Sequence, residues 1–348
     1  MNGNIAKKYI DNNMKVIIED FSLPILKPWK FFSKKKKIRK IIEEERPDII
    51  HIHFVTNALM LRLALRKIEI PRLFQVPGPL HLENRFFRKI EIKTSNKFDY
   101  WAPACKKSKE LYLKEGIEPE RVFLAYYGGY GGKTIDEYIE NEKCLHKQYN
   151  IKNDNIIIGM VSYFYKPKWY LGQKRGIKGH EDFIDAIEIL NKKYNNITAV
   201  IVGGAWNNSS KYEQKVKEYA NKKKINNIIF TGFRNDIKKI YKEIDIAVHP
   251  SHSENLGGAA ESLAAGVPTV ATNVGGFPDI IKNGVTGFLC EKENPKDLAD
   301  KISKMIENKE LSIKMSLQGQ KSIRNMLDIG ITSNNILKIY NNIIKKEK

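Results

Sequence analysis

Short apolar runs and longer amphipathic runs alternate along the second half of the chain. From Ile156 onward, strand-like runs such as "NIIIGMVS" and "ITAVIVGG" are separated by segments such as "HEDFIDAIEILNKKY", in which apolar residues recur every three or four positions. Further strand-like runs follow in "NIIFTGF", "DIAVHPS", "PTVATNV" and "GFLC". Apolar strands that alternate with helices predict an α/β fold with a parallel, doubly wound sheet.

The first half repeats this pattern less regularly. Strands are predicted in "MKVIIEDF", "PDIIHIHF", "PRLFQVPG", "FDYWAPAC" and "RVFLAYYGG". The pattern lapses and the sequence turns polar around residues 133–154. We therefore predict two α/β domains, residues 1–150 and 151–330, followed by a helical segment, residues 331–348, that packs back on the first domain.

Composition narrows the class of protein. The 348 residues carry 60 Lys and Arg against 40 Asp and Glu, a formal net charge of +20. This excess predicts an anionic neighbour, which is nucleic acid, a phosphate-bearing substrate or an acidic membrane surface, although a general Lys, Ile and Asn bias explains part of it. The chain lacks a long uninterrupted apolar run and a leader pattern, so we expect a cytoplasmic protein. Its three cysteines are too widely spaced for a disulfide framework or a zinc site.

One stretch carries candidate chemistry. In "HPSHSENLGGAAESLAAGVPTVATNVGG", Glu254 and Glu261 flank the glycine pair Gly257 and Gly258 at the end of a predicted strand. Ligands of open parallel sheets bind beyond the carboxyl ends of the strands, so Glu254 is predicted to reach the crevice. The glycine N–H groups at the start of a helix form an anion site. A ligand with an anionic middle and hydroxyl-rich ends, such as a nucleotide sugar, fits this arrangement.

An exposed helix face is the alternative interpretation of the two glutamates, because this spacing is common on solvated helices. Glu261, however, stands among residues too apolar for a solvated helix: Ala259, Ala260, Leu263, Ala264 and Ala265. A charge in such a helix needs a partner. The sequence therefore favours a binding role for Glu261.

The same stretch resembles the donor-binding segment of the retaining GT-B glycosyltransferases of family 4, also called glycosyl transferases group 1. The likeness rests on the paired glutamates, "AAGVPTVAT", "VGG" and "NGVTGFL" in this order, and it extends over most of Ile156 to Leu289 and more weakly from Lys15 to Gly128. It implies a GT-B fold, in which two Rossmann-like domains face a cleft. Residues 1–150 would then lie on the acceptor side, and residues 151–330 would bind the nucleotide sugar.

The resemblance also implies roles for individual residues. Glu254 and the amides that follow it would hold the transferred sugar, and Glu261 would bind the ribose hydroxyls. "GIKGHEDFIDAI" makes Lys178 the candidate for binding the diphosphate, and "QVPGPLHLE" makes His81 a polar group beside the sugar. We thus expect catalytic roles for Glu254, Lys178 and His81, and donor-binding roles for Glu261, Asn255, Leu256, Gly257, Gly258, Phe233, Arg234 and Arg175. The alternatives are an exposed lysine at a helix start for Lys178 and a structural role for His81.

Three departures from the family pattern stand out. Six residues rather than seven separate the two glutamates, and Met160 occupies the position expected for a phosphate-binding arginine. The basic loop "YFYKPKWYLGQKRG" offers Arg175, Lys174 or Lys168 as replacements. The family's opening strand and glycine-rich loop are not found before the first predicted strand, so we expect the first domain to lack them.

These features predict a metal-independent transferase. The sequence has no Asp-x-Asp to hold a divalent ion, so we expect no metal and no cofactor, with Lys178, another basic residue and the helix amides neutralising the diphosphate. By resemblance, the acceptor is a saccharide or a lipid-linked saccharide of surface polysaccharide or lipopolysaccharide assembly. The alternatives are a nucleotide-sugar epimerase, a hydrolase with two carboxylates, a dehydrogenase, and a nucleic-acid-binding protein. The dehydrogenase is disfavoured because "VIVGGAW" lacks the Gly-x-Gly-x-x-Gly pattern.

A basic and aromatic segment lies in the first domain. "KPWKFFSKKKKIRK", residues 27–40, interleaves Trp29, Phe31 and Phe32 with lysines and an arginine. This composition favours an anionic membrane interface, and so a peripheral location on the inner face of the cell membrane. Single-stranded nucleic acid, or a solvated basic turn with inward aromatic rings, would have a similar sequence.

Overall fold

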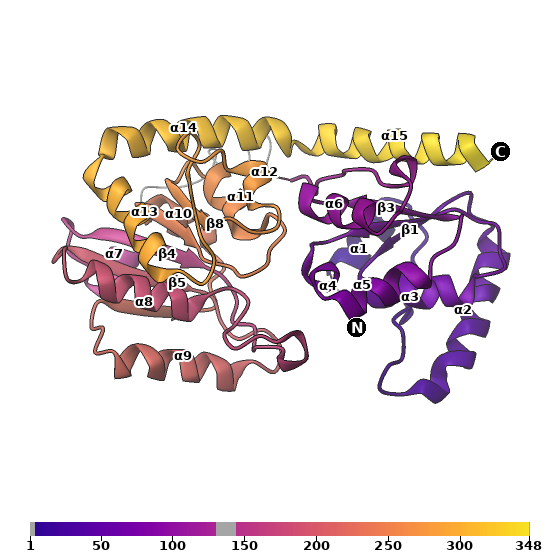
Figure 1. Ribbon diagram of the computed structural model, residues 1–348, viewed down its shortest axis with the longest axis horizontal. Coiled ribbons are helices and arrows are strands. Elements are labelled where there is room, and N and C mark those ends of the chain that lie inside the picture. The colour runs from indigo at the N-terminus through magenta and orange to yellow at the C-terminus, as the bar shows by residue number, and fades with distance from the viewer. Residues whose placement is uncertain (1–3, 130–143, 348) are drawn as a thin grey trace.

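The computed structural model describes residues 4–129 and 144–347. Two parallel sheets form two α/β lobes, joined along one edge by the last two helices (Figure 1). The N-terminal sheet has three strands in the order β1-β2-β3, and the C-terminal sheet has six in the order β6-β5-β4-β7-β8-β9. The α/β fold with two parallel-sheet domains is as the alternating pattern predicts.

The N-terminal sheet consists of β1 (Ile50–His53), β2 (Arg72–Val76) and β3 (Asp99–Pro103). Every residue of β2 and β3 is buried, as the apolar runs require. The helices of this lobe are α1 (Asn4–Asp11), α2 (Phe31–Glu45), α3 (Val55–Ala64), α4 (Leu80–Glu83), α5 (Arg85–Lys93) and α6 (Lys106–Lys114).

Two predicted strands of this lobe differ from the structure. "MKVIIEDF" forms no strand: it is irregular, and Ile17 and Ile18 are 40% and 58% exposed. An apolar run becomes a strand only where another strand takes up its backbone hydrogen bonds. "RVFLAYYGG" is an extended edge of β3, where Val122 forms a bridge with Trp101 and the Phe123 N–H donates to the Trp101 carbonyl at 2.8 Å.

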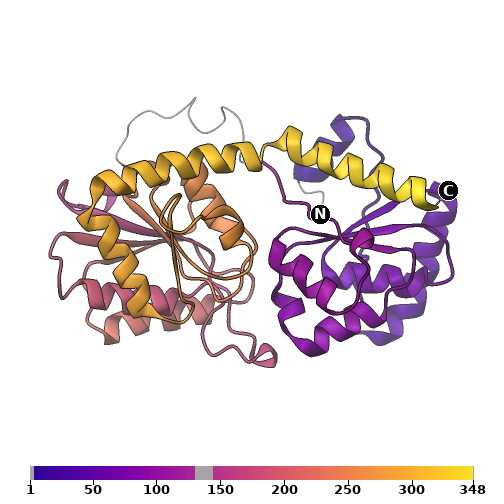
Figure 2. The same cartoon turned by 45° about the horizontal axis from the view of Figure 1, so that its top comes forward.

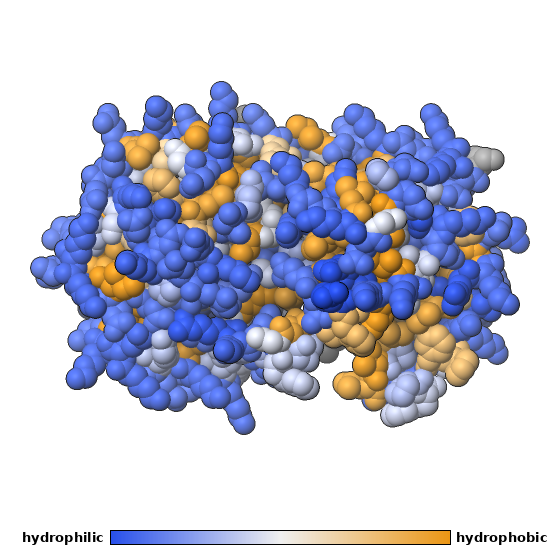
Figure 3. Space-filling model, viewed as in Figure 1, coloured by the Kyte–Doolittle hydropathy of each residue, from blue (hydrophilic) through white to orange (hydrophobic). Residues whose placement is uncertain are grey.

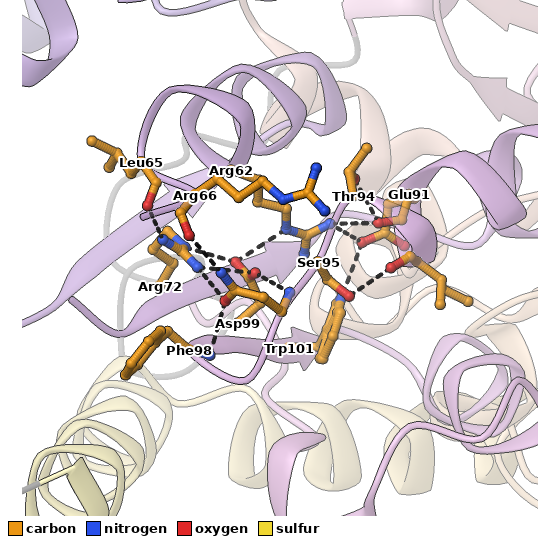
Figure 4. A network of polar contacts seen from close by, with 12 residues as sticks. Arg62, Leu65, Arg66, Arg72, Glu91, Thr94, Ser95, Phe98, Asp99 and Trp101 are labelled. Carbon is orange, nitrogen blue, oxygen red and sulfur yellow. Dashed lines mark hydrogen bonds and ion pairs between the residues drawn. The ribbon is translucent and has the colours of Figure 1, made fainter. Parts of the chain in front are cut away.

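A buried ion network holds the N-terminal lobe together (Figure 4). Arg72 Nε donates to Asp99 Oδ1 at 2.8 Å, and Arg62 Nη1 donates to Glu91 Oε1 at 2.8 Å. Arg62 Nε also reaches Asp99 Oδ1 at 3.3 Å, and Trp101 Nε1 donates to Glu91 Oε1 at 2.8 Å. All five side chains are at most 1% exposed, so the network ties β2, β3, α3 and α5 together inside the lobe.

The C-terminal sheet contains all six strands predicted for it: β4 (Ile156–Val161), β5 (Ile197–Val202), β6 (Ile228–Gly232), β7 (Ile246–His249), β8 (Thr269–Thr272) and β9 (Phe288–Cys290). β4 pairs with β5 on one side and β7 on the other, so the strand order reverses there. Such a reversal is where open α/β sheets bind ligands. The surrounding helices are α7 (Cys144–Tyr149), α8 (His180–Leu190), α9 (Ser210–Lys222), α10 (Ile237–Glu243), α11 (Gly257–Ala264), α12 (Phe277–Ile280), α13 (Pro295–Glu307) and α14 (Lys309–Met326).

The last helix, α15 (Ile329–Glu347), lies on the N-terminal lobe (Figures 1 and 2). Its Ile339 and Ile343 pack with Leu73 and Tyr100 of that lobe. Its Tyr340 is hydrogen-bonded to His51. Asp279 makes a second connection between the lobes, because its Oδ2 accepts from the Lys106 N–H at 2.7 Å. None of the helices within residues 4–129 and 144–347 combines the length and apolarity needed to cross a bilayer.

Candidate active site

A cavity of about 270 Å³ opens at the carboxyl edge of the C-terminal sheet, where β4, β5 and β6 end and α11 begins. Six of the predicted site residues line it: Lys178, Phe233, Arg234, Gly257, Gly258 and Glu261. These residues come from three separate segments of the sequence. The structure therefore brings most of the predicted donor-binding residues around one space at the strand-order reversal.

The glycine pair shapes the anion-binding end of this cavity. Gly257 has φ +38°, and a Cβ there would lie 2.9 Å from Cδ of Glu254. A Cβ on Gly258 would lie 2.9 Å from Cε1 of His249 and 3.2 Å from the Val161 carbonyl oxygen. Only glycines allow α11 to start this close to the strand ends. The first N–H groups of a helix have no partner within it, so this start is an anion-binding position.

Lys178 supplies the positive charge of the cavity. It is ion-paired and hydrogen-bonded with Glu254, and their side chains are 22% and 14% exposed. Burial acts to lower the pKa of Lys178, but the Glu254 carboxylate outweighs it and raises that pKa, so the side chain is an ammonium. Gly179, with φ +72°, packs so closely on the Pro250 carbonyl that a Cβ would lie 2.0 Å from its oxygen. This contact sets Lys178 against the end of β7.

Glu261, unlike Glu254, is one of the residues that line the cavity. Glu261 is exposed as a residue, and its carboxyl opens onto the cavity and is only partly surrounded by protein atoms. This partial burial raises its pKa, although the Tyr241 hydroxyl, which donates to Oε2 at 3.4 Å, and the charge of Lys178 oppose the increase. The carboxylate therefore keeps hydrogen-bonding capacity toward the cavity.

Aromatic rings form the far wall. Phe233 is 62% exposed and lies nearly parallel to Tyr163, with 6.4 Å between ring centroids and 19° between planes. Trp206 lies 5.0 Å from Tyr163. Arg234 is held by Asp236, to which its Nε donates at 2.7 Å. Sequence reasoning missed Tyr163, which lines the cavity. The signal for it is the aromatic content of the loop after β4, a loop whose basic residues alone enter the prediction.

A buried histidine, His249, packs against the start of α11. His249 is 5% exposed, and its Nε2 lies 3.0 Å from Ser262 Oγ. Burial, assisted by the charge of Lys178, lowers its pKa to about 3, so the ring is neutral. Because Gly258 packs on this ring, His249 positions the start of α11.

Arg175 is not brought to the cavity. Its guanidinium is paired with Asp182 and Asp185, both on α8, at 2.8 Å from Oδ2 of Asp185. Arg175 is thus paired with acidic side chains and is not among the residues that line the cavity, so its role in holding phosphate stays a prediction. Lys168 and Lys174 are exposed in the same loop and do not line the cavity either. Leu256 is 3% exposed in an apolar cluster and does not line the cavity.

His81 lies in the N-terminal lobe, on α4, and does not line the cavity. Its Nε2 is 3.9 Å from Oε2 of Glu91; burial lowers its pKa, and Glu91 opposes that effect. The preceding loop does meet the donor side, because a Cβ on Gly78 would lie 3.4 Å from Cβ of Asn255. Asn255 itself donates its N–H to Glu254 Oε1 at 3.1 Å. The loop before α4 therefore adjoins the Glu254 segment across the two lobes.

Within the part of the chain that the structure describes, no three His, Cys, Asp or Glu side chains cluster as metal ligands do. His51 and His53 are engaged elsewhere, with Tyr340 and with Tyr127 at 3.1 Å.

Comparison with known proteins identifies the family. Residues 169–322 match the family model of the glycosyl transferases group 1, and residues 9–128 match that of glycosyltransferase family 4. An uncharacterized glycosyltransferase of Methanocaldococcus jannaschii, MJ1607, is 30% identical over 306 residues, which are 84% of this chain and 75% of that protein. The chain belongs to the family 4 glycosyltransferases.

Other relatives of this glycosyltransferase span nearly its whole length. The capsular polysaccharide biosynthesis glycosyltransferase CapM of Staphylococcus aureus is 24% identical over 99% of this chain and 89% of its own. Among solved structures, Anabaena HepE in complex with UDP and glucose superposes with a TM-score of 0.77 at 19% identity, covering 97% of this chain and 88% of that one. A Rickettsia africae glycosyltransferase gives 0.78 at 22% identity, over 99% and 88%. These likenesses confirm the GT-B fold.

Proposed function

We propose that this glycosyltransferase moves a hexose from a nucleotide-sugar donor to a saccharide or lipid-linked saccharide, with retention at the anomeric carbon. The observation that supports the donor most directly is the cavity itself. There the Lys178 ammonium, which is paired with the Glu254 carboxylate beside the cavity, the amides at the start of α11 and the Glu261 carboxylate surround about 270 Å³. The cationic groups suit a diphosphate, and the carboxylates suit hydroxyls on either side of it.

The donor has one favoured direction in this cavity. Phe233 and Tyr163 offer aromatic faces for the nucleobase, and Glu261 adjoins them for the ribose hydroxyls. Lys178 and the amides of Gly257 and Gly258 then meet the diphosphate. The transferred sugar lies toward Glu254 and Asn255, next to the N-terminal lobe. HepE was solved with UDP and with UDP-glucose, which makes uridine donors the first to test here.

Charge neutralisation drives the proposed transfer. As the bond between the anomeric carbon and the diphosphate breaks, negative charge develops on the leaving phosphate oxygen. Preorganised donors aimed at that oxygen, here the Lys178 ammonium and the α11 amides, stabilise it. This arrangement needs no divalent ion, so the proposed reaction proceeds in EDTA. The acceptor hydroxyl enters on the side of the leaving group, as the family resemblance implies.

The relatives favour a lipid-linked acceptor in polysaccharide assembly. One, from Campylobacter jejuni, is named an N,N'-diacetylbacillosaminyl-diphospho-undecaprenol α-1,3-N-acetylgalactosaminyltransferase, and it is 24% identical over 98% of this chain. Another, from Escherichia coli, is named a galactosyltransferase acting on an N-acetylglucosamine-diphosphoundecaprenol. A bilayer-embedded acceptor would bring the enzyme to the inner face of the cell membrane.

Calorimetric titration with UDP, GDP, ADP and CMP, in EDTA, tests the donor site. We expect one nucleotide to bind tightly to the wild type and to the Lys168→Ala control, and at least about tenfold more weakly to Glu261→Ala. Incubation with the matching sugar donor then separates the reactions, because an epimerase would convert the donor without an acceptor. Absence of nucleotide binding, or equal binding by Glu261→Ala, would contradict the proposed donor site.

A further inference from the structure

An apolar ledge protrudes from the N-terminal lobe just before and at the start of α2. It consists of Ile25, Leu26, Trp29 and Phe32, which are 68%, 90%, 71% and 76% exposed. Figure 1 shows the turn that leads into α2 at the lower edge of this lobe, and the space-filling view shows an apolar surface there (Figure 3). Large apolar side chains gathered on one exposed projection are typical of an interaction surface.

The ledge is anchored on both sides. Before it, Phe21 and Leu23 pack against the core of the lobe, and the Leu23 N–H donates to the Thr56 carbonyl at 3.0 Å. Between Trp29 and Phe32, Phe31 packs against the same core. An inward orientation of the aromatic rings therefore holds for Phe31 and is wrong for Trp29 and Phe32. The exposed side chains sit on a fixed turn between buried neighbours.

Unpaired lysines surround the ledge. Lys34 and Lys37 are ion-paired with Asp20 and Glu19. In contrast, the described residues provide no carboxylate partner for four further lysines of this segment: Lys27, Lys30, Lys35 and Lys36. Along α2, a shallow depression of about 710 Å³ is lined by Phe32 and mainly by basic side chains. The surface is thus apolar at its tip and cationic around it.

We propose that the apolar ledge inserts into the headgroup and upper acyl region of an anionic lipid bilayer, with the surrounding lysines on lipid phosphates. Apolar contact plus a basic patch is the pair of signals that gives stable peripheral anchoring. Ile25 and Leu26 distinguish this partner from single-stranded nucleic acid. Nucleic acid uses aromatic faces for stacking, whereas aliphatic side chains gain from leaving water in a lipid phase.

The inference rests on the proposed function in one respect: membrane binding would bring the enzyme to a lipid-linked acceptor. Its existence can be tested without a donor or an acceptor. Failure of vesicle binding would leave the donor site intact, and failure of nucleotide binding would leave the apolar ledge intact.

The test is cosedimentation of the full chain with phosphatidylcholine vesicles, with and without about one third phosphatidylglycerol. We expect binding to the anionic vesicles that weakens with salt, and little binding to neutral ones. Leu26→Ser/Trp29→Ser should bind the anionic vesicles at least about tenfold more weakly, because two buried apolar contacts are lost. Transfer to a water-soluble saccharide should be unchanged in this variant.

A matched control removes exposed apolar side chains elsewhere. Ile313 and Leu317 are 57% and 61% exposed on α14, the helix that lies along the opposite edge of the molecule in Figure 1. Ile313→Ser/Leu317→Ser should bind anionic vesicles as the wild type does. Equal binding by the ledge variant and the wild type, or equal binding to neutral and anionic vesicles, would overturn the proposal. So would loss of oligonucleotide binding in the ledge variant with vesicle binding unchanged.

Discussion

Two groups of charged side chains, one in each lobe, use similar residues for different ends. In the N-terminal lobe, Arg62, Arg72, Glu91 and Asp99 are at most 1% exposed and bond to one another and to backbone carbonyls. In the C-terminal lobe, Lys178 and Glu254 are 22% and 14% exposed beside an open cavity. Both groups join segments distant in the sequence. The closed group uses most of its polar atoms within the fold, although Arg62 Nη2 and Glu91 Oε2 have no hydrogen-bond partner there, whereas the open group lies where a ligand can reach it.

The closed network should dominate stability. Asp99→Ala leaves Arg62 and Arg72 buried without their shared carboxylate, and removing one partner of a buried pair costs about 3–5 kcal/mol. We expect a loss of that size in the free energy of unfolding, measured by urea denaturation. Asp300→Ala is the control, because the Asp300–Lys304 pair at 2.9 Å is about half exposed and should contribute less than about 1 kcal/mol. Similar losses in both variants would remove the distinction between the two kinds of ion pair.

The open pair should dominate turnover. Lys178→Ala removes the ammonium that faces the leaving diphosphate, so we expect kcat/KM to fall by about 100- to 1,000-fold. Its effect on the free energy of unfolding should be well below that of Asp99→Ala, because Lys178 and Glu254 are 22% and 14% exposed and the Asp99 pairs are at most 1% exposed. Lys174→Ala, an exposed lysine of the neighbouring loop, is the control for charge alone. Unchanged turnover in Lys178→Ala would show that the cavity works without this cation.

The sequence predicted the open site better than the closed network. The strands of the C-terminal sheet have strong apolar patterns, and the Glu254 segment is local, so its spacing specifies much of the geometry. The network joins Arg62, Arg72, Glu91 and Asp99, which lie on four elements and share no motif. Such pairing depends on tertiary packing, which periodicity does not encode.

The differences between the predicted and the observed lining of the cavity have a related cause. Arg175 and Tyr163 belong to one loop, and composition does not specify which side chains of a loop turn inward. The structure turns the aromatic Tyr163 into the cavity and pairs Arg175 with α8 outside it. In the N-terminal lobe, "MKVIIEDF" has the composition of a strand, but strand formation depends on a neighbour that local sequence does not reveal.

Removing an aromatic ring from the cavity wall should have an intermediate effect on nucleotide affinity. This effect separates recognition of the base from recognition of the diphosphate charge. Tyr163→Ala should weaken binding of the preferred nucleotide by about tenfold, because a base stacked on an aromatic ring is worth roughly 1–3 kcal/mol. Trp169→Ala is the matched control, since Trp169 is 85% exposed in the same loop and does not line the cavity. Calorimetry with the nucleotide and with inorganic diphosphate checks this directly. An equal loss for diphosphate would assign Tyr163 to the phosphates instead.

The smallest effect concerns Glu261, where function and stability should oppose each other. Partial burial raises the pKa of its carboxyl, so the folded protein holds this proton more tightly than the unfolded chain does. The stability it contributes is present at low pH and is lost as pH rises through the folded pKa. Glu261→Gln should therefore be more stable than the wild type at pH 7, by less than about 1 kcal/mol because the carboxyl opens onto water.

That stability difference should shrink toward zero below about pH 4, where the wild-type carboxyl is protonated in both states. Glu91→Gln provides the contrast, because it alters the closed network around Arg62 and should destabilise the protein at pH 7. Denaturation of both variants between pH 4 and pH 7 separates the two cases. A Glu261→Gln variant less stable than the wild type at pH 7 would mean that Tyr241 and Lys178 stabilise the Glu261 carboxylate by more than its partial burial destabilises it. In that case Glu261, like Glu91, would contribute mainly to the stability of the fold.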